Sequence, residues 1–204
     1  MDKAISQLLC DINDDDCHIR FAAARTLGDI GAETPDALDA LFNALNDNTW
    51  FVRLAALQTL RDLQLEPTIV LQKIIPILKD DHEDVREYAA LTLGDLGTKG
   101  KPAILPLVEA LSDSVWYVRA TVAWVLGEIG SDAGKCCHRL IDCLQDDEPE
   151  VRINSARTLG MINWTENKDM IRVLEKAADD NDQLPEVKEE IFLALKKISE
   201  SKDV

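Results

Sequence analysis

Apolar residues recur along this chain three and four residues apart, and the runs that they form return at a fixed interval. The clearest marker is a Val or Ile followed by an Arg, and these arginines are equally spaced along the chain. A sixth copy comes slightly late and has Lys188 in the arginine place. A constant period of this kind predicts one supersecondary unit stacked on itself, rather than a globule around a single core. The five arginines are Arg20, Arg53, Arg86, Arg119 and Arg152.

Each arginine begins a pattern that predicts a helix, which we call helix B, with positions counted from the arginine as zero. Small or apolar residues follow Arg86 at +3, +4, +7 and +10, which is one face of a helix. Glycine at +11 in three copies (Gly31, Gly97 and Gly130) predicts a left-handed C-terminal cap. Glycine at +8 is unfavourable inside a helix, so it predicts close approach of a neighbouring helix. The +8 glycines are Gly28, Gly94, Gly127 and Gly160.

A second apolar run precedes each arginine and predicts another helix, which we call helix A. Pro35, Pro67 and Pro102 stand where helix A should begin, a position that tolerates the missing amide hydrogen. The turn between the two helices has an Asp at −6 in five copies. These pairs fill residues 1–204 as one all-α domain, with repeats predicted at approximately 1–31, 34–64, 66–97, 100–130, 132–163 and 166–204.

The pattern resembles HEAT repeats, and specifically the short variety found in phycobilin lyase subunits. The residues that carry the resemblance are the Val-Arg pairs, with Leu-Gly pairs downstream, and they extend over essentially the whole chain. The resemblance implies an α-solenoid, a right-handed superhelix of about six helix pairs. It also implies that the arginine and the turn aspartate form a ladder along the stack. The Val-Arg pairs are Val52-Arg53, Val85-Arg86, Val118-Arg119 and Val151-Arg152.

Packing does not explain the helix B positions +1, +5 and +9, which lie on a stripe away from the core. The resemblance implies that this stripe faces a concave groove. Position +9 holds carboxylates in four successive copies, and aromatic residues occur on or near the stripe, so we expect a partner site here. The other interpretation is that +9 is a solvated position. The expected partner-binding residues are Phe21, Arg25, Asp29, Trp50, Leu54, Gln58, Asp62, Tyr88, Leu91, Asp95, Trp116, Trp124, Glu128 and Arg157.

The chain is acidic, with 38 carboxylates against 22 Lys and Arg, which disfavours binding of nucleic acid. It has no apolar run of transmembrane length and no secretory signal at its beginning. The five cysteines are odd in number and unevenly spaced, so we expect no disulfide framework and a cytoplasmic location. We expect no membrane association and a monomer or heterodimer.

The cysteine cluster Cys136-Cys137-His138, with Cys143 nearby, has the composition of a metal site. The repeat register instead places Cys137 and Cys143 at core positions and His138 at an exposed one, so we expect no metal. Cys10 and Cys17 align with polar positions and should be exposed thiols. Deoxyhypusine hydroxylase, an enzyme built from similar repeats, binds two irons through repeated His-Glu pairs. Only one such pair, His82-Glu83, occurs here, so we do not expect that chemistry.

The sequence leaves two functional interpretations open. The first is a non-catalytic scaffold without a cofactor that binds a basic or amphipathic protein on the helix B face. The alternative is a bilin lyase subunit or phycobilisome-handling factor, in which Tyr88, Trp124 and the carboxylates hold phycocyanobilin or a related tetrapyrrole. That alternative rests on the resemblance alone, and it would make the protein an enzyme.

Overall fold

The computed structural model describes residues 3–30, 34–130, 133–162, 168–179 and 183–200. In these ranges the chain forms twelve α-helices and three short 3-10 helices, and no strand. The fold is therefore an α-solenoid, as the periodicity predicts. The chain forms two compact units, Met1–Thr92 and Leu93–Val204, which are described in turn.

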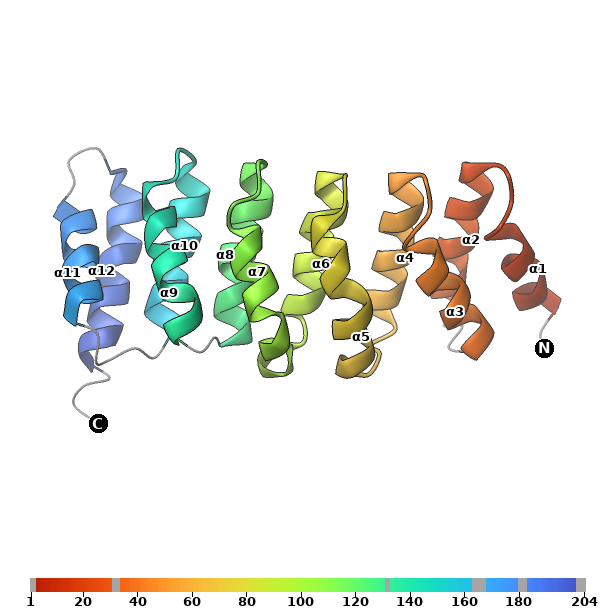
Figure 1. Ribbon diagram of the computed structural model, residues 1–204, viewed down its shortest axis with the longest axis horizontal. Helices are drawn as coiled ribbons and strands as arrows, with labels where there is room; N and C mark the ends of the chain where they lie inside the picture. Colours follow the sequence, from red (N-terminus) through yellow and green to blue (C-terminus); the bar gives the residue numbers. More distant parts are fainter. Residues whose placement is uncertain (1–2, 31–33, 131–132, 163–167, 180–182, 201–204) are drawn as a thin grey trace. The chain divides into compact units, whose positions relative to one another are not determined.

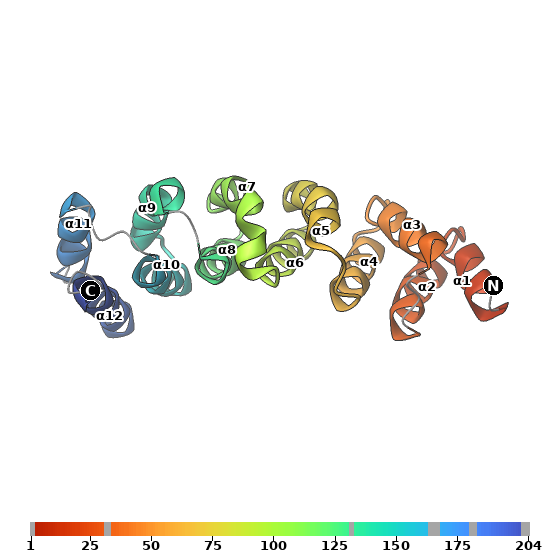
Figure 2. The same ribbon diagram turned by 90° about the horizontal axis from the view of Figure 1, so that it is seen from below.

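The first unit alternates A and B helices in the predicted order. In Figures 1 and 2, α3 and α5 lie in one layer while α2 and α4 lie side by side in the other. Helix α6 begins in this unit and ends at Gly94, just inside the second. The elements are α1 (Lys3–Asp11), α2 (Cys17–Asp29), α3 (Pro35–Ala44), α4 (Trp50–Asp62), α5 (Pro67–Ile74), the 3-10 helix η1 (Ile75–Lys79) and α6 (Glu83–Gly94).

The second unit repeats the arrangement, with α7, α9 and α11 in one layer and α8, α10 and α12 in the other (Figure 2). Helix α10 packs against both α8 and α12. The elements are η2 (Gly97–Ala103), α7 (Ile104–Ala110), α8 (Trp116–Ile129), α9 (Ala133–Asp142), η3 (Cys143–Gln145), α10 (Pro149–Met161), α11 (Lys168–Asp179) and α12 (Pro185–Glu200).

Prolines explain where several A helices begin and where one ends. Pro35 and Pro67 occupy the first turns of α3 and α5, as predicted. The expectation for Pro102 was wrong, because it lies inside η2, before α7 begins. Pro76 has no amide hydrogen to continue an α-helical ladder, and there helix A of the third repeat becomes the 3-10 helix η1.

The core combines the B-helix positions +3, +4 and +7 and the valine before the arginine, in repeats that have one, with A-helix residues such as Leu41, Ile74 and Leu107. Ala89, Ala90 and Leu93 are fully buried, and their equivalents in repeats one to five are also buried. Small residues at +3 and +4 let neighbouring helices approach closely. The predicted helical face is therefore the packed face at +3, +4 and +7, whereas at +10 Ile129 is fully buried but Ile30 is 48% exposed.

The +8 glycines lie where successive B helices touch. A Cβ on Gly28 would lie 2.9 Å from Thr59 Cγ2, and one on Gly127 would lie 2.8 Å from Thr158 Oγ1. Both threonines stand at +6 of the following repeat, and their buried hydroxyls donate to carbonyls of the preceding B helix. Thr59 binds Ala24 O at 3.0 Å, and Thr158 binds Ala123 O at 2.7 Å. The close approach predicted from glycine at +8 is confirmed.

The backbone is left-handed at offset +11, just after the B helices. Gly130 caps α8 with φ 64°, which confirms that predicted cap. Gly97 also has a left-handed φ of 51°, but α6 ends at Gly94 and Gly97 begins η2. Gly31 lies outside the described residues. Gln64, at the same offset in the second repeat, has φ 48° without being glycine.

The arginines and turn aspartates form the ladder that the resemblance implies. Arg53 donates to Asp80 through Nε at 2.7 Å and Nη2 at 2.6 Å, and its Nη1 donates to Asp47 O at 2.9 Å. Arg20 and Arg119 bind Asp47 and Asp146 with the same geometry. Each aspartate belongs to the repeat after its arginine, so the ladder joins each of these repeats to the next one.

The ladder groups hold their charges firmly. Burial alone would raise the pKa of Asp47, but hydrogen bonds from Arg20 and the Thr49 amide outweigh it and hold that pKa below its usual value. Asp80 has a lowered pKa for the same reasons, with Arg53 as its cation. The hydrogen bond to Asp80 raises the pKa of Arg53. The ladder is therefore a structural feature that stays ionised at neutral pH.

Candidate functional site

The candidate site lies on the exposed stripe of the B helices at offsets −3, +1, +5 and +9, which we call the B-helix stripe. These offsets are four residues apart, so their side chains follow one another along one side of a helix. Positions +1 and +9 are separated by about 12 Å along the axis. The predicted site residues lie on this stripe with two exceptions: Tyr88 lies at +2, and Asp95 lies in the turn just after α6. Leu91 lies on the stripe but is half-buried.

In the first unit, the stripe of α2 and α4 changes from apolar at its beginning to acidic at its end. Phe21 and Trp50 are exposed near the helix starts, at 37% and 38% of their surface, while Leu54 is half-buried. At +5, Arg25 Nη1 donates to Gln58 Oε1 at 2.9 Å, so these two side chains already bind each other. Asp29 and Asp62 are exposed at the last positions of α2 and α4.

Three aromatic residues of the first unit were not predicted as part of the site. Phe51 contacts Phe21 edge to face at 5.8 Å and stacks with His18 at 5.6 Å. Trp50 touches Phe51 at 5.8 Å and stacks on His82 with the rings 3.9 Å apart and 9° from parallel. The sequence carried a signal, because the −2 register is aromatic or His at His18, Phe51 and Tyr117. We call His18, Phe21, Trp50, Phe51 and His82 the aromatic cluster.

Tyr88 is less available than predicted. It is half-buried, and the guanidinium of Arg61 lies over its ring, 5.2 Å from the centroid. Arg61 occupies the +8 position that is glycine in neighbouring repeats, so the covering of Tyr88 follows from that substitution.

In the second unit, the stripe of α8 carries two exposed tryptophans and a carboxylate. Trp116 starts the helix and packs edge to face with Tyr117 at 5.7 Å. Trp124 is 37% exposed one turn before the exposed Glu128. Asp95, in the same unit, is exposed as well.

Arg157 is exposed on α10, but it is engaged within the protein. Its Nη2 lies 2.6 Å from Glu190 Oε1 on α12, and that hydrogen bond raises the pKa of Arg157. It is therefore a weaker candidate for partner binding than the tryptophans.

The position of the carboxylates is unfavourable for the helices that carry them. Asp29 and Asp62 are the last residues of their helices, and Glu128 is next to last, where the helix dipole is negative. None of the three has an ion-pair partner among the residues that the structure describes. Like charges at a helix C-terminus reduce stability by about 0.3–1 kcal/mol each. An uncompensated local penalty of this kind is typical of functional positions.

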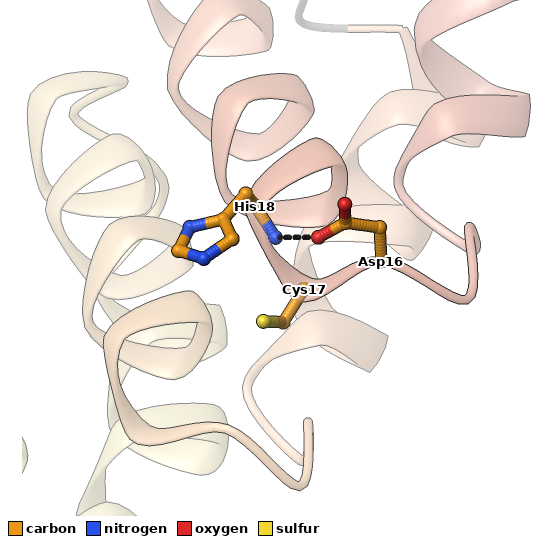
Figure 3. A group of neighbouring side chains, drawn as sticks. All are labelled: Asp16, Cys17 and His18. Atoms are coloured by element: carbon orange, nitrogen blue, oxygen red, sulfur yellow. Dashed lines mark hydrogen bonds between the residues drawn. The ribbon is translucent and has the colours of Figure 1, made fainter.

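One group of possible metal ligands occurs at the start of α2. Ligand atoms of Asp16, Cys17 and His18 lie within 4.8 Å of one another. The Asp16 carboxylate accepts the His18 amide at 2.8 Å and so caps the helix, as Figure 3 shows. The His18 ring stacks on Phe51, and the positive end of the helix disfavours a cation. Capping and stacking account for these residues.

The other cysteines follow the repeat register where they can be placed. Cys143 is buried, and burial raises the pKa of its thiol to about 11, so it behaves as an apolar side chain. His138 and Cys10 are exposed, as predicted, but Cys17 is half-buried rather than exposed. The side chains of Cys136 and Cys137 lie outside the described residues.

A hollow of about 280 Å³ lies beside Cys143. Its two arginines already face carboxylates. Arg119 binds Asp146, and Arg139 Nη1 lies 3.6 Å from Asp142 Oδ2. The hollow is therefore part of the ladder region and offers no uncompensated charge to a ligand.

No helix in the described ranges has the length and apolarity to cross a bilayer.

Comparison with known proteins supports the fold. Solved structures of similar form include an engineered protein (20% identity, 97% of each chain covered, TM-score 0.69). A HEAT-like repeat protein from the archaeon Thermococcus onnurineus is 16% identical, with coverage of 98% of this chain and 88% of that one and a TM-score of 0.64. A designed armadillo repeat protein in complex with the peptide (KR)4 is 18% identical, with coverage of 95% and 99% and a TM-score of 0.67. At these identities the likeness concerns the fold alone.

No curated protein matches the chain. A family model of HEAT repeats matches residues 2–68, 71–136 and 138–204. Because those segments include nearly every residue, the chain belongs to the HEAT-repeat family.

Proposed function

We propose that this chain is a non-catalytic scaffold whose B-helix stripes bind a basic, amphipathic segment of a partner protein. The observation that carries the proposal is the set of exposed carboxylates at the ends of α2, α4 and α8, which have no cation among the described residues. A partner's Lys or Arg placed there would neutralise a charge that the helix dipole disfavours. The free thiols Cys10, Cys17 and Cys143 support a reducing compartment such as the cytoplasm.

The apolar part of the stripe gives the partner its second feature. Phe21 and Trp50 in the first unit, and Trp124 in the second, expose ring surface on the same side of the helices as the carboxylates. Aromatic residues dominate binding energy at protein interfaces. A segment that alternates apolar and basic side chains fits both parts of the stripe. The designed armadillo repeat protein found in complex with (KR)4 supports a basic peptide as occupant of such a fold.

The test uses the peptide (KR)4 as the probe, with a peptide of eight glutamates as its counterpart. We expect only (KR)4 to bind, and its association rate to fall as salt rises, because the Debye length shrinks from ~10 Å at 0.1 M to ~3 Å at 1 M. The double variant Asp29→Asn/Asp62→Asn should weaken binding about tenfold, since each exposed charge pair contributes up to about 1 kcal/mol. Equal binding by this variant and the wild type would contradict the proposal.

Two further measurements separate binding from a general loss of negative charge. The control Asp39→Asn removes an exposed carboxylate from α3, on a helix A, and should leave (KR)4 binding unchanged. Asp62→Asn should weaken binding while raising the thermal midpoint, because the unfavourable charge at the end of α4 is gone. If Asp62 were only a solvated surface residue, Asp62→Asn would leave (KR)4 binding unchanged, as Asp39→Asn does.

Binding of a bilin is the alternative that the same stripe allows, and it would make the chain part of a lyase. A site that holds a tetrapyrrole extended and dry should shift and sharpen its visible absorption. We expect free phycocyanobilin to show no such shift, because Trp50, Trp116 and Trp124 each leave more than a third of their surface exposed, so none of them is enclosed in a dry pocket. A saturable shift that disappears in Trp124→Ala would contradict the scaffold proposal. Because lyases of this kind work as heterodimers, the spectrum should be repeated with a candidate partner subunit.

A further inference from the structure

Trp124 differs from the other tryptophans of the described ranges in what surrounds its ring. Trp50 and Trp116 each pack against other aromatic rings. Trp124 makes no ring contact within the part of the chain that the structure describes, and 37% of its surface is exposed. It stands at +5 of α8, in the middle of an internal repeat. Its indole ring is therefore open to a ligand.

A carboxylate lies one helical turn after this ring. Glu128 is four residues beyond Trp124 and exposed, so the two side chains are neighbours on the surface of α8, with Cβ atoms about 5–6 Å apart. No described cation binds Glu128. It is the next-to-last residue of α8, where the helix dipole favours a positive charge. The end of α8 thus offers a ring face and an anion side by side.

Helix α10 adds an apolar side chain to this place. A Cβ on Gly127 would lie 3.3 Å from Met161 Sδ, so the thioether of Met161 reaches α8 directly beside Glu128. Met161 is 45% exposed, and its flexible side chain can adapt to a ligand. The cation at +5 of α10, Arg157, lies 2.6 Å from Glu190 of α12, so its charge is already compensated.

A guanidinium group matches this combination better than an ammonium group does. It is planar and weakly hydrated, so it can stack on an aromatic face while the N–H groups at its edge donate to a carboxylate. An ammonium group is compact and strongly hydrated, and it gains less from a ring. The protein contains an example of such stacking in its first unit, where the guanidinium of Arg61 lies 5.2 Å from the centroid of the Tyr88 ring.

The stripe of the first unit has carboxylates at +9 but no ring at +5. One turn before Asp62 stands Gln58, and one turn before Asp29 stands Arg25. Arg25 Nη1 donates to Gln58 Oε1 at 2.9 Å, so these two side chains are engaged with each other. Carboxylates without a neighbouring ring attract lysine and arginine alike. The two units therefore differ in the cation that they select.

We infer that Trp124 and Glu128 form a subsite that selects arginine over lysine. The guanidinium of a partner's arginine stacks on Trp124 and donates to Glu128, while Met161 packs against the apolar stem of the same side chain. This inference rests on the proposed function, because it requires that a basic segment binds the B-helix stripes. It adds that the partner residue at α8 is an arginine and that Trp124 determines this specificity.

Two peptides of equal length and charge, eight arginines and eight lysines, test the inference by titration calorimetry at one salt concentration. The wild type should bind the arginine peptide about fivefold more tightly. Trp124→Leu should bind the two peptides alike, because the ring is lost, whereas Trp124→Phe should keep part of the preference. Glu128→Gln should also reduce the ratio, since the guanidinium loses its charged acceptor. Circular dichroism on each variant verifies that it is folded.

The matched control is Trp116→Leu on the same helix. Trp116 is 43% exposed, but the residue one turn after it is the buried Ala120 rather than a carboxylate. This variant should affect both peptides alike, so the ratio should stay at about fivefold. Equal binding of the two peptides by the wild type overturns the inference and leaves the proposed function intact. A preference that survives Trp124→Leu, or one that Trp116→Leu also removes, overturns the inference as well. If neither peptide binds, the proposed function fails together with it.

Discussion

Gln64 has the left-handed backbone that the equivalent positions Gly97 and Gly130 reach without strain. A residue with a Cβ is about 1–2 kcal/mol less stable in this conformation than glycine. Gln64→Gly should therefore raise the free energy of unfolding by about 1 kcal/mol, even though glycine also loses more entropy on folding. Urea denaturation, followed by helical circular dichroism, measures the change.

The matched control is Gly130→Ala, which introduces at the C-cap of α8 the backbone strain that Gln64→Gly removes just after α4. It should lower the free energy of unfolding by about 1 kcal/mol. If Gln64→Gly instead destabilised the chain, the cap would depend on the glutamine side chain rather than on backbone conformation.

The ladder gives a pH dependence at the residue scale. The pKa of Asp80 is lowered in the folded state, so its contribution to stability is present above the unfolded pKa of about 3.9 and is lost as pH falls through the folded value. Asp80→Asn should cost about 1–3 kcal/mol at pH 7, because it removes the partly buried carboxylate that Arg53 binds through Nε and Nη2 and leaves only the exposed Asp81 as its anion. Below the folded pKa the difference from wild type should shrink.

Urea midpoints of wild type and Asp80→Asn between pH 7 and pH 2 test this expectation. Asp39→Asn, an exposed carboxylate on α3, is the control and should show no such convergence. A midpoint difference between wild type and Asp80→Asn that stays constant across this pH range would show that Asp80 stabilises the fold through packing and not through its charge.

At the element scale, contact between successive B helices depends on a glycine at +8 and a small or β-branched residue at +6. In Gly127→Ala the new Cβ would meet Thr158 Oγ1 at 2.8 Å and disturb the hydroxyl that binds Ala123 O. Alanine favours the helix by about 1 kcal/mol, but overpacking and the weakened buried bond cost about 1–3 kcal/mol. The net expected effect is a loss of about 1 kcal/mol.

A double-mutant cycle with Thr158→Ala isolates this contact. Thr158→Ala makes room for the new methyl group. The stability loss of the double variant should therefore be smaller than the two single losses added together, by at least about 0.5 kcal/mol. Simple additivity would mean that Gly127 and Thr158 do not constrain each other.

The elements themselves were largely predictable, because each helix-forming and core-forming residue type returns at the constant period set by the arginines. The close approach at the +8 glycines followed from the same alignment, whereas the ladder was implied by the resemblance to HEAT repeats. The break of helix A at Pro76 and the 3-10 helix before Ile104 are local departures that the average pattern hides. The aromatic cluster escaped prediction for a different reason. Trp50 meets His82 across a repeat boundary, and offsets within one helix do not reveal such contacts.

The candidate site was predicted less completely than the fold. Exposure of the +9 carboxylates follows from helical spacing, and the structure agrees for Asp29, Asp62, Asp95 and Glu128. The engagement of Arg25 with Gln58 and of Arg157 with Glu190 depends on side-chain reach between helices. Periodicity supplies the positions of such residues but not their partners.

For the whole molecule, charge opposes the compact state. The formal net charge is −16, and the carboxylates at the ends of α2, α4 and α8 have no cation among the described residues. Salt screens this repulsion more than it screens the partly buried ladder pairs. The thermal midpoint should therefore rise between about 0.01 M and 0.5 M NaCl.

The double variant Asp29→Asn/Asp62→Asn should gain less from salt than the wild type, because part of the repulsion has been removed. A midpoint that falls as salt rises would instead show that screened ion pairs dominate stability.

The ladder always points the same way where it is seen, from an arginine to the turn aspartate of the following repeat. Its polarity has a consequence for how such a chain changes length over evolution. If recombination between two copies of the gene segment deletes or duplicates a block one period long, a ladder arginine can still meet an aspartate and a +8 glycine can still meet a +6 residue. The protein can gain or lose whole repeats without inventing a new interface, and its reach toward a partner can be adjusted in steps of one repeat.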